Sequence, residues 1–82
     1  MDKDSLAQIY AADLLAKNDP SAAAEAMFEM MERSIAEDSE KDQEVVKDFI
    51  ILIVKIIKDI DSEYADEMTY LYFERTLKEY IP

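Results

Sequence analysis

The longest apolar run of this chain covers residues 49–54, with the sequence Phe-Ile-Ile-Leu-Ile-Val, and continues after Lys55 with Ile56 and Ile57. It is too short to cross a bilayer, which takes about 20 apolar residues. It is also too apolar for a helix that packs on one side only. The run must therefore be buried against other helices, either in its own chain or in a second copy of the chain.

Helix-forming residues dominate the rest of the sequence. Gly is absent, Pro occurs only at positions 20 and 82, and Ala, Glu, Lys, Met and Leu are abundant. No segment shows the alternation that is typical of strands. We therefore predict an all-α fold, a small four-helix bundle formed by a single helical domain over residues 1–82, which assembles as a homodimer. The helices are expected at about 5–17, 20–37, 40–60 and 62–80.

Local signals mark the predicted helix ends. Ser5 and Gln8 have the spacing of a capping box, with Asp4 as a competing cap. Asp19 precedes Pro20 as an N-cap would precede the first helical residue. Asp61 or Ser62 caps the fourth helix. Without Gly the stop near residue 37 is weak, so one continuous helix from 20 to 60 remains an alternative. The short connections predict that consecutive helices pack as antiparallel neighbours.

Two helices have more apolar surface than one neighbour can cover. At 100° per residue, the apolar side of the third helix is wider than the arc of about 100° that one neighbour needs, and Ile51 lies alone within its polar strip. The apolar face of the fourth helix changes direction between its first and second halves. We therefore predict at least two neighbours for the third helix and a subunit contact for the fourth. The candidate interface residues are Ile51, Leu71, Phe73, Leu77 and Tyr80.

The missing residue types exclude several classes of function. Without His and Cys the chain cannot form a Ser–His or Cys–His catalytic pair or a Cys/His zinc site, and without Gly it cannot form a phosphate-cradling loop. We predict that it uses no cofactor. The net charge of −11 opposes contact with nucleic-acid phosphates and anionic membranes, so neither is expected as a partner. No signal-peptide pattern follows Met1, which predicts a cytoplasmic protein.

The acidic charge favours a non-catalytic protein-interaction module, such as an adaptor, an inhibitor or a regulatory factor, with a basic protein as its partner. Glu25, Glu29 and Glu32 recur on the side of the second helix opposite its Met side chains. We call the predicted contact surface the acidic ridge, and it consists of Glu25, Glu29, Glu32, Glu37, Asp38 and Glu40. The alternative is a solvated face that only keeps the protein from aggregating.

An enzymatic alternative rests on paired carboxylates. The segments Glu29-Met-Met-Glu32 and Glu63-Tyr-Ala-Asp66 resemble the Glu-x-x-Glu and Glu-x-x-Asp motifs of all-α nucleotide pyrophosphohydrolases. The resemblance implies that Glu29, Glu32, Glu63 and Asp66 hold Mg²⁺, which neutralises phosphate oxygens during hydrolysis. Because Glu29 and Glu32 lie opposite the apolar face of their helix, we prefer the interaction module.

Overall fold

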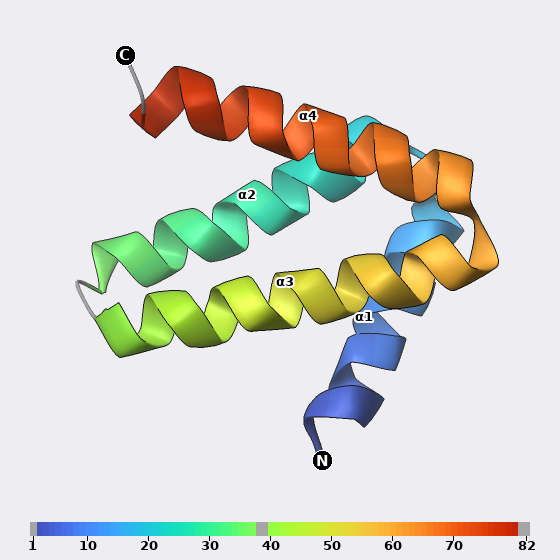
Figure 1. The fold of residues 1–82 in the computed structure, drawn as a ribbon, viewed down its shortest axis with the longest axis horizontal. Coiled ribbons are helices and arrows are strands. Elements are labelled where there is room, and N and C mark those ends of the chain that lie inside the picture. Colours follow the sequence, from blue (N-terminus) through green and yellow to red (C-terminus); the bar gives the residue numbers. More distant parts are fainter. Residues whose placement is uncertain (1, 38–39, 81–82) are drawn as a thin grey trace.

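The computed structural model describes residues 2–37 and 40–80, and within these ranges its regular elements are all α-helices (Figure 1). The elements are α1 (Lys3–Lys17), α2 (Pro20–Ala36), α3 (Glu40–Ile60) and α4 (Ser62–Tyr80). The prediction of a small all-α four-helix bundle is therefore confirmed. The bounds of α3 and α4 agree with the predicted ranges, whereas α1 begins two residues before the predicted start.

The early start of α1 comes from its N-cap. Asp2 accepts a hydrogen bond from the backbone N–H of Ser5 at 2.8 Å, so Ser5 lies inside the helix. The predicted capping box with Ser5 as N-cap is wrong, because a carboxylate is a stronger acceptor than a hydroxyl and interacts favourably with the helix dipole. The hydrogen bonds from Ser5 lower the pKa of the Asp2 carboxyl.

The turn between α1 and α2 is made by residues 18–20. Asn18 adopts a left-handed conformation with φ 49°, and its N–H donates to the carbonyl of Leu15 at 3.1 Å. This position usually takes Gly, and Asn is the substitute that tolerates it best. Asp19 then accepts hydrogen bonds from the first turn of α2, with Pro20 at its start, as predicted. Only Asn18 and Asp19 therefore separate the end of α1 from the start of α2.

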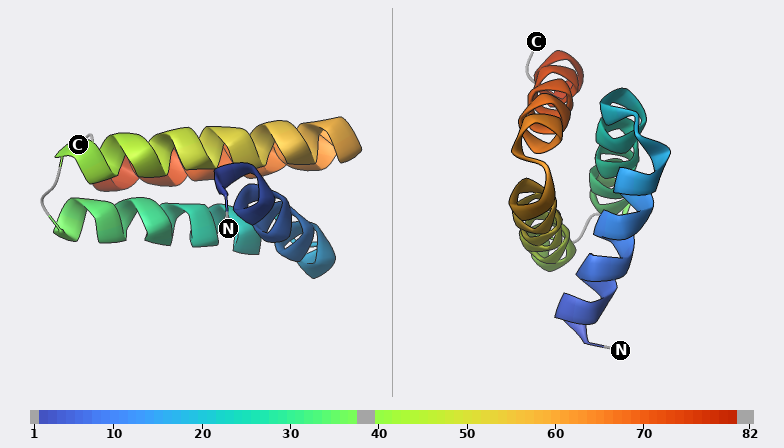
Figure 2. Two further views of the ribbon diagram at one scale, coloured as in Figure 1. Left: turned by 90° about the horizontal axis from the view of Figure 1, so that it is seen from below. Right: turned by 90° about the vertical axis from the view of Figure 1, so that its right-hand side faces the viewer.

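The four helices form two layers. Figure 2 shows α3 and α4 side by side in one layer and α1 and α2 in the other. In Figure 1, α2 runs in the same direction as α4 and opposite to α3. The molecule is flat, with extents of 33 × 32 × 16 Å. One face of the α3–α4 layer is therefore covered by α1 and α2, and its other face is open.

Helix α3 is the centre of the bundle. It contacts α1, α2 and α4, which confirms the prediction of at least two neighbours. Helix α1 packs mainly across α3, where the rings of Tyr10 and Phe49 meet edge to face at 5.5 Å, and it contacts α2 little. The predicted antiparallel packing of α1 on α2 is therefore wrong, because the tight turn at Asn18 directs the two helices apart.

The buried core occupies the covered side of the α3–α4 layer. Its members come from all four helices and are Ala7, Ala11, Leu14, Ala23, Ala24, Met27, Ile50, Ile53, Ile57, Tyr64, Ala65 and Met68. The Tyr64 hydroxyl donates a hydrogen bond of 2.8 Å to the carbonyl of Leu14, one of the last four carbonyls of α1 that have no partner within the helix. Burial raises the pKa of Tyr64. This bond ties the first turn of α4 to the end of α1.

Candidate interaction surfaces

An apolar groove of about 510 Å³ lies between α3 and α4, on the open face of their layer. Helix α2 forms its floor with Met27 and Met31, because it lies behind and between α3 and α4 in the views of Figures 1 and 2. We call this cavity the α3–α4 groove. It is lined by Met27, Met31, Lys47, Ile50, Ile51, Val54, Lys55, Lys58, Thr69, Tyr72, Phe73 and Thr76.

The groove follows from helical periodicity. Ile50, Ile51 and Val54 lie three and four residues apart on one side of α3, and Thr69, Tyr72, Phe73 and Thr76 repeat this spacing on α4. Between these two walls, Ile51 and Phe73 remain 45% and 58% exposed. A single packed chain thus leaves two large apolar side chains uncovered beside an apolar cavity.

The charges at the groove are of one sign. Its charged lining residues are Lys47, Lys55 and Lys58, all from α3. This is unexpected in a chain with 20 acidic and 9 basic residues. Lys58 has an exposed ion pair with Asp66 at 3.8 Å, which contributes little by itself. The groove therefore combines an apolar floor with a basic rim, which we call the lysine rim.

Sequence reasoning did not find the lysine rim. The sequence did contain one signal for the groove, which is Ile51 within the polar strip of α3. An isolated apolar side chain among charged ones indicates a part of the strip that another helix can cover. The strip also holds Glu44, Asp48 and Asp59. Which of its charges face the groove depends on where α4 lies, and the helical pattern of α3 does not contain that information.

The predicted interface residues divide between the open face and the core. Ile51 and Phe73 line the groove, and Leu77 is 52% exposed one turn beyond Phe73. Leu71 is half-buried and packs against the core of its own chain. The side chain of Tyr80 lies outside the described residues. Tyr70, which is 67% exposed, joins Phe73 and Leu77 in an apolar row along α4 that we call the outer strip.

The acidic ridge lies along α2. Glu25 forms an ion pair with Arg75 at 3.3 Å, and the Arg75 guanidinium lies over the ring of Phe28, 4.8 Å from its centroid. Glu29 and Glu32 are exposed and line a shallow depression together with Arg33. Of the outer members, Glu37 and Glu40 are exposed, and Asp38 lies outside the described residues. One end of the ridge is thus bound to α4, and its middle faces solvent.

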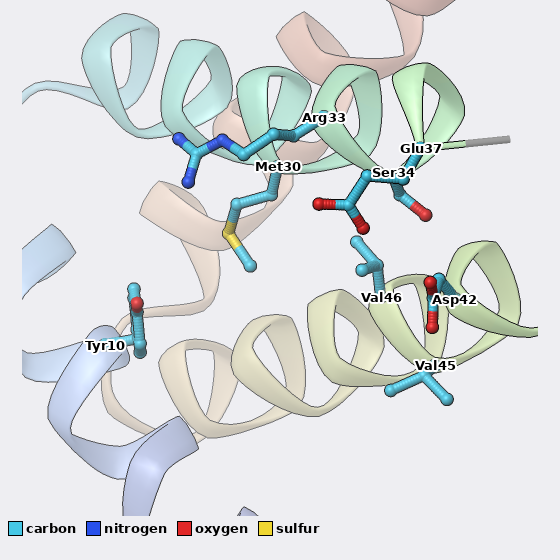
Figure 3. A pocket seen from close by; sticks show the side chains of 8 residues that line it. All are labelled: Tyr10, Met30, Arg33, Ser34, Glu37, Asp42, Val45 and Val46. Carbon is cyan, nitrogen blue, oxygen red and sulfur yellow. The ribbon is translucent and has the colours of Figure 1, made fainter. Parts of the chain in front are cut away.

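A pocket of about 330 Å³ lies between the end of α2 and the start of α3 (Figure 3). In Figure 3 the carboxylate of Glu37 projects from α2 toward Val46 of α3. Ser34 lines the same pocket and is 3% exposed, and its Oγ has no hydrogen-bond partner among the described residues. Because this oxygen is shut off from solvent, it adds a cost to folding rather than a contact to a ligand.

The carboxylates of the enzymatic alternative do not form a metal site within one chain. Over residues 2–37 and 40–80, the structure gathers no group of three or more His, Cys, Asp or Glu side chains that could hold a metal ion. Glu29 and Glu32 lie on the exposed side of α2, and Asp66 is paired with Lys58. The four carboxylates of the motif resemblance are therefore not gathered into a metal-binding cluster within the described residues.

Comparison of this chain with protein-family models, with curated proteins and with solved structures finds no match. Over the described residues, none of the helices has both the length and the apolar character needed to span a membrane. The features of this chain that bear on its function are the groove, its lysine rim and the acidic ridge.

Proposed function

We propose that this protein is a non-catalytic interaction module whose main docking site is the α3–α4 groove. The observation that carries the proposal is an apolar cavity left open beside Ile51 and Phe73. Grooves of this kind bind the apolar face of an α-helix. Met27 and Met31 in the floor suit this role, because unbranched Met side chains adapt to the shape of what they contact.

The acidic ridge provides the same module with a second contact surface, for a basic protein. Glu29 and Glu32 are exposed on α2 and Glu37 is exposed at its C-cap, in the layer opposite the groove opening. Contacts of this kind speed association and confer specificity, and they weaken as salt concentration rises. A partner in the groove and a partner on the ridge can therefore be bound at the same time.

A pull-down from an extract of the native host tests the proposal with three forms of the chain. Wild type is compared with Ile51→Glu, which places a charge at the groove, and with the double variant Glu29→Lys and Glu32→Lys on the ridge. We expect one captured protein to be lost with Ile51→Glu and retained by the ridge variant. In calorimetry, that captured protein, once purified, should bind wild type and the ridge variant more tightly than it binds Ile51→Glu.

Circular dichroism of both variants controls for folding. Capture of the same proteins by wild type and by Ile51→Glu would contradict the assignment of the groove as the main docking site. Binding that depends only on Glu29 and Glu32, and that weakens with salt, would instead place the function on the ridge.

A further inference from the structure

We propose that the α3–α4 groove is filled by helix α4 of a second copy of this chain, so that two copies cover each other's open faces. This inference rests on the proposed function, because it names the occupant of the same groove. It assigns that occupant from the charges and apolar side chains of the open face.

The groove specifies what can fill it. An apolar floor and walls require an apolar helix face, while Lys47 and Lys55 favour acidic side chains beside that face. Lys58, the third lysine of the rim, already has its exposed ion pair with Asp66. A second basic helix would bring like charges together, which costs several kcal/mol across an interface. The occupant is therefore an amphipathic helix with acidic residues along one edge of its apolar strip.

Helix α4 has this character on its own exposed side. Tyr70, Phe73 and Leu77 form the outer strip at spacings of three and four residues. Glu63, Glu67 and Glu74 follow one edge of the strip at spacings of four and seven. Glu63 and Glu67 are exposed. Glu74 is half-buried, and its Oε1 forms an ion pair with Nζ of Lys78 at 3.4 Å. The chain thus contains both the groove and a helix with matching chemistry.

The groove and the strip are adjacent, which allows a symmetric dimer. Phe73 belongs to both, because it lines the groove and lies in the outer strip. A two-fold axis close to Phe73 places each strip in the other copy's groove, as the self-complementary interface of a two-fold dimer requires. In length, α4 with its 19 residues matches the wall that α3 offers with 21. One symmetry operation thus covers both open faces.

The lysine rim explains how such an acidic chain can associate with itself. Each copy has a net charge of −11, so two copies repel each other at long range. The charged side chains lining the groove are all positive, so the repulsion is replaced by attraction at the place where the copies meet. The dimer also completes the core of a flat chain that is small for an independent fold.

Sedimentation equilibrium of the full chain at micromolar concentration is the first test. We expect a dimer of the 9.5 kDa chain, and a dissociation constant raised about 100-fold or more by Phe73→Glu, which buries a charge in the groove. The matched control is Ile9→Glu, since Ile9 on α1 is also about half exposed, at 53%, but lies away from the groove. The control should leave the dimer intact.

A charge exchange tests the proposed pairing itself. One chain carries Lys47→Glu and Lys55→Glu in its groove, and the other carries Glu67→Lys and Glu74→Lys beside its strip. Each chain alone faces like charges at both contacts and should be monomeric, whereas a mixture restores opposite charges at both contacts and should form a 1:1 heterodimer in native mass spectrometry. A monomeric mixture of folded chains would overturn the pairing.

The two proposals fail in different ways. A wild-type chain that stays monomeric even at about 100 µM overturns the second copy as occupant. If Ile51→Glu still loses a host protein in that case, the groove remains a docking site for another chain. If wild type is dimeric and neither Phe73→Glu nor the charge exchange changes this, the contact lies elsewhere and the inference is wrong.

Discussion

The two halves of α4 place their apolar side chains in opposite environments. In the first half Tyr64, Ala65 and Met68 are buried against the other helices, whereas in the second half Phe73 and Leu77 are more than half exposed. Both halves belong to one continuous helix, so the difference comes from the neighbours. The first half lies where four helices converge, and the second lies where residues 2–37 and 40–80 provide no element that covers the open face. The contrast separates what stabilises the chain from what is available for binding.

Truncation of one side chain from each half of α4 should give the largest difference in the free energy of unfolding. Met68→Ala removes a fully buried side chain and is expected to lower the free energy of unfolding by about 2–5 kcal/mol. Phe73→Ala removes an exposed ring and should change it by less than about 1 kcal/mol in dilute solution, where association is absent. Urea unfolding followed by circular dichroism measures both.

The effect of Phe73→Ala on stability should also depend on protein concentration. If the open face is covered by a second copy, the loss of stability in this variant should grow with protein concentration, because only the dimer uses the ring. Equal losses for Met68→Ala and Phe73→Ala in dilute protein would contradict the division of α4 into a core half and a binding half.

The hydrogen bond at the buried end of α4 should have a smaller effect. Tyr64→Phe keeps the ring but leaves the carbonyl of Leu14 without its partner, so we expect a loss of about 1–3 kcal/mol in the free energy of unfolding. Thermal unfolding at neutral pH gives the value. Tyr70→Phe, at an exposed tyrosine of the same helix, is the matched control and should be close to neutral.

The same residue predicts a dependence on pH. Burial raises the pKa of Tyr64 above its ordinary value of 10.0, so the folded state retains the proton more strongly than the unfolded state. This contribution is fully present below about pH 10 and is lost as the pH rises through the folded-state pKa. The stability difference between wild type and Tyr64→Phe should therefore shrink above pH 10. A difference that stays constant up to pH 11 would contradict the assigned environment.

The smallest predicted effect is a gain in stability. Ser34 is buried and its hydroxyl has no hydrogen-bond partner in the described part of the chain, so Ser34→Ala should raise the free energy of unfolding by about 1 kcal/mol. The buried hydroxyl is removed and a better helix former replaces it. A loss of stability instead would show that the hydroxyl has a partner in solution, for example an ordered water. Chemical unfolding of the two proteins decides between these outcomes.

Local chemistry explains which helix ends could be predicted. Asp19, Pro20 and Asp61 stand at the starts of α2 and α4, where their own side chains satisfy or remove the need for backbone partners. At the first helix the predicted caps, Ser5 and its competitor Asp4, were both wrong, because the carboxylate of Asp2 accepts the hydrogen bond from the Ser5 N–H. The apolar width of α3 likewise predicted several neighbours, because the area to be covered can be counted along one helix.

The candidate site was predicted only in part. Ile51, Phe73 and Leu77 were identified because an apolar residue in a polar strip and a split helix face can both be seen in the sequence. The lysine rim was missed, since Lys47, Lys55 and Lys58 share their side of α3 with acidic residues. The path of α1 was also missed, because one residue in a left-handed conformation, Asn18, changes the direction of the chain.

The amino-acid sequence is enough to show that this chain is helical, where most of its helices begin and end, and that its apolar surface exceeds what one neighbour can bury. These properties depend on caps and periodicity, which act over a few residues. The crossing of α1 over α3, and the α3–α4 groove that stays open with lysines along its rim, are visible only once the four helices are packed together. That arrangement depends on how the apolar faces of four helices pack against one another, and the sequence pattern of a single helix does not predict it.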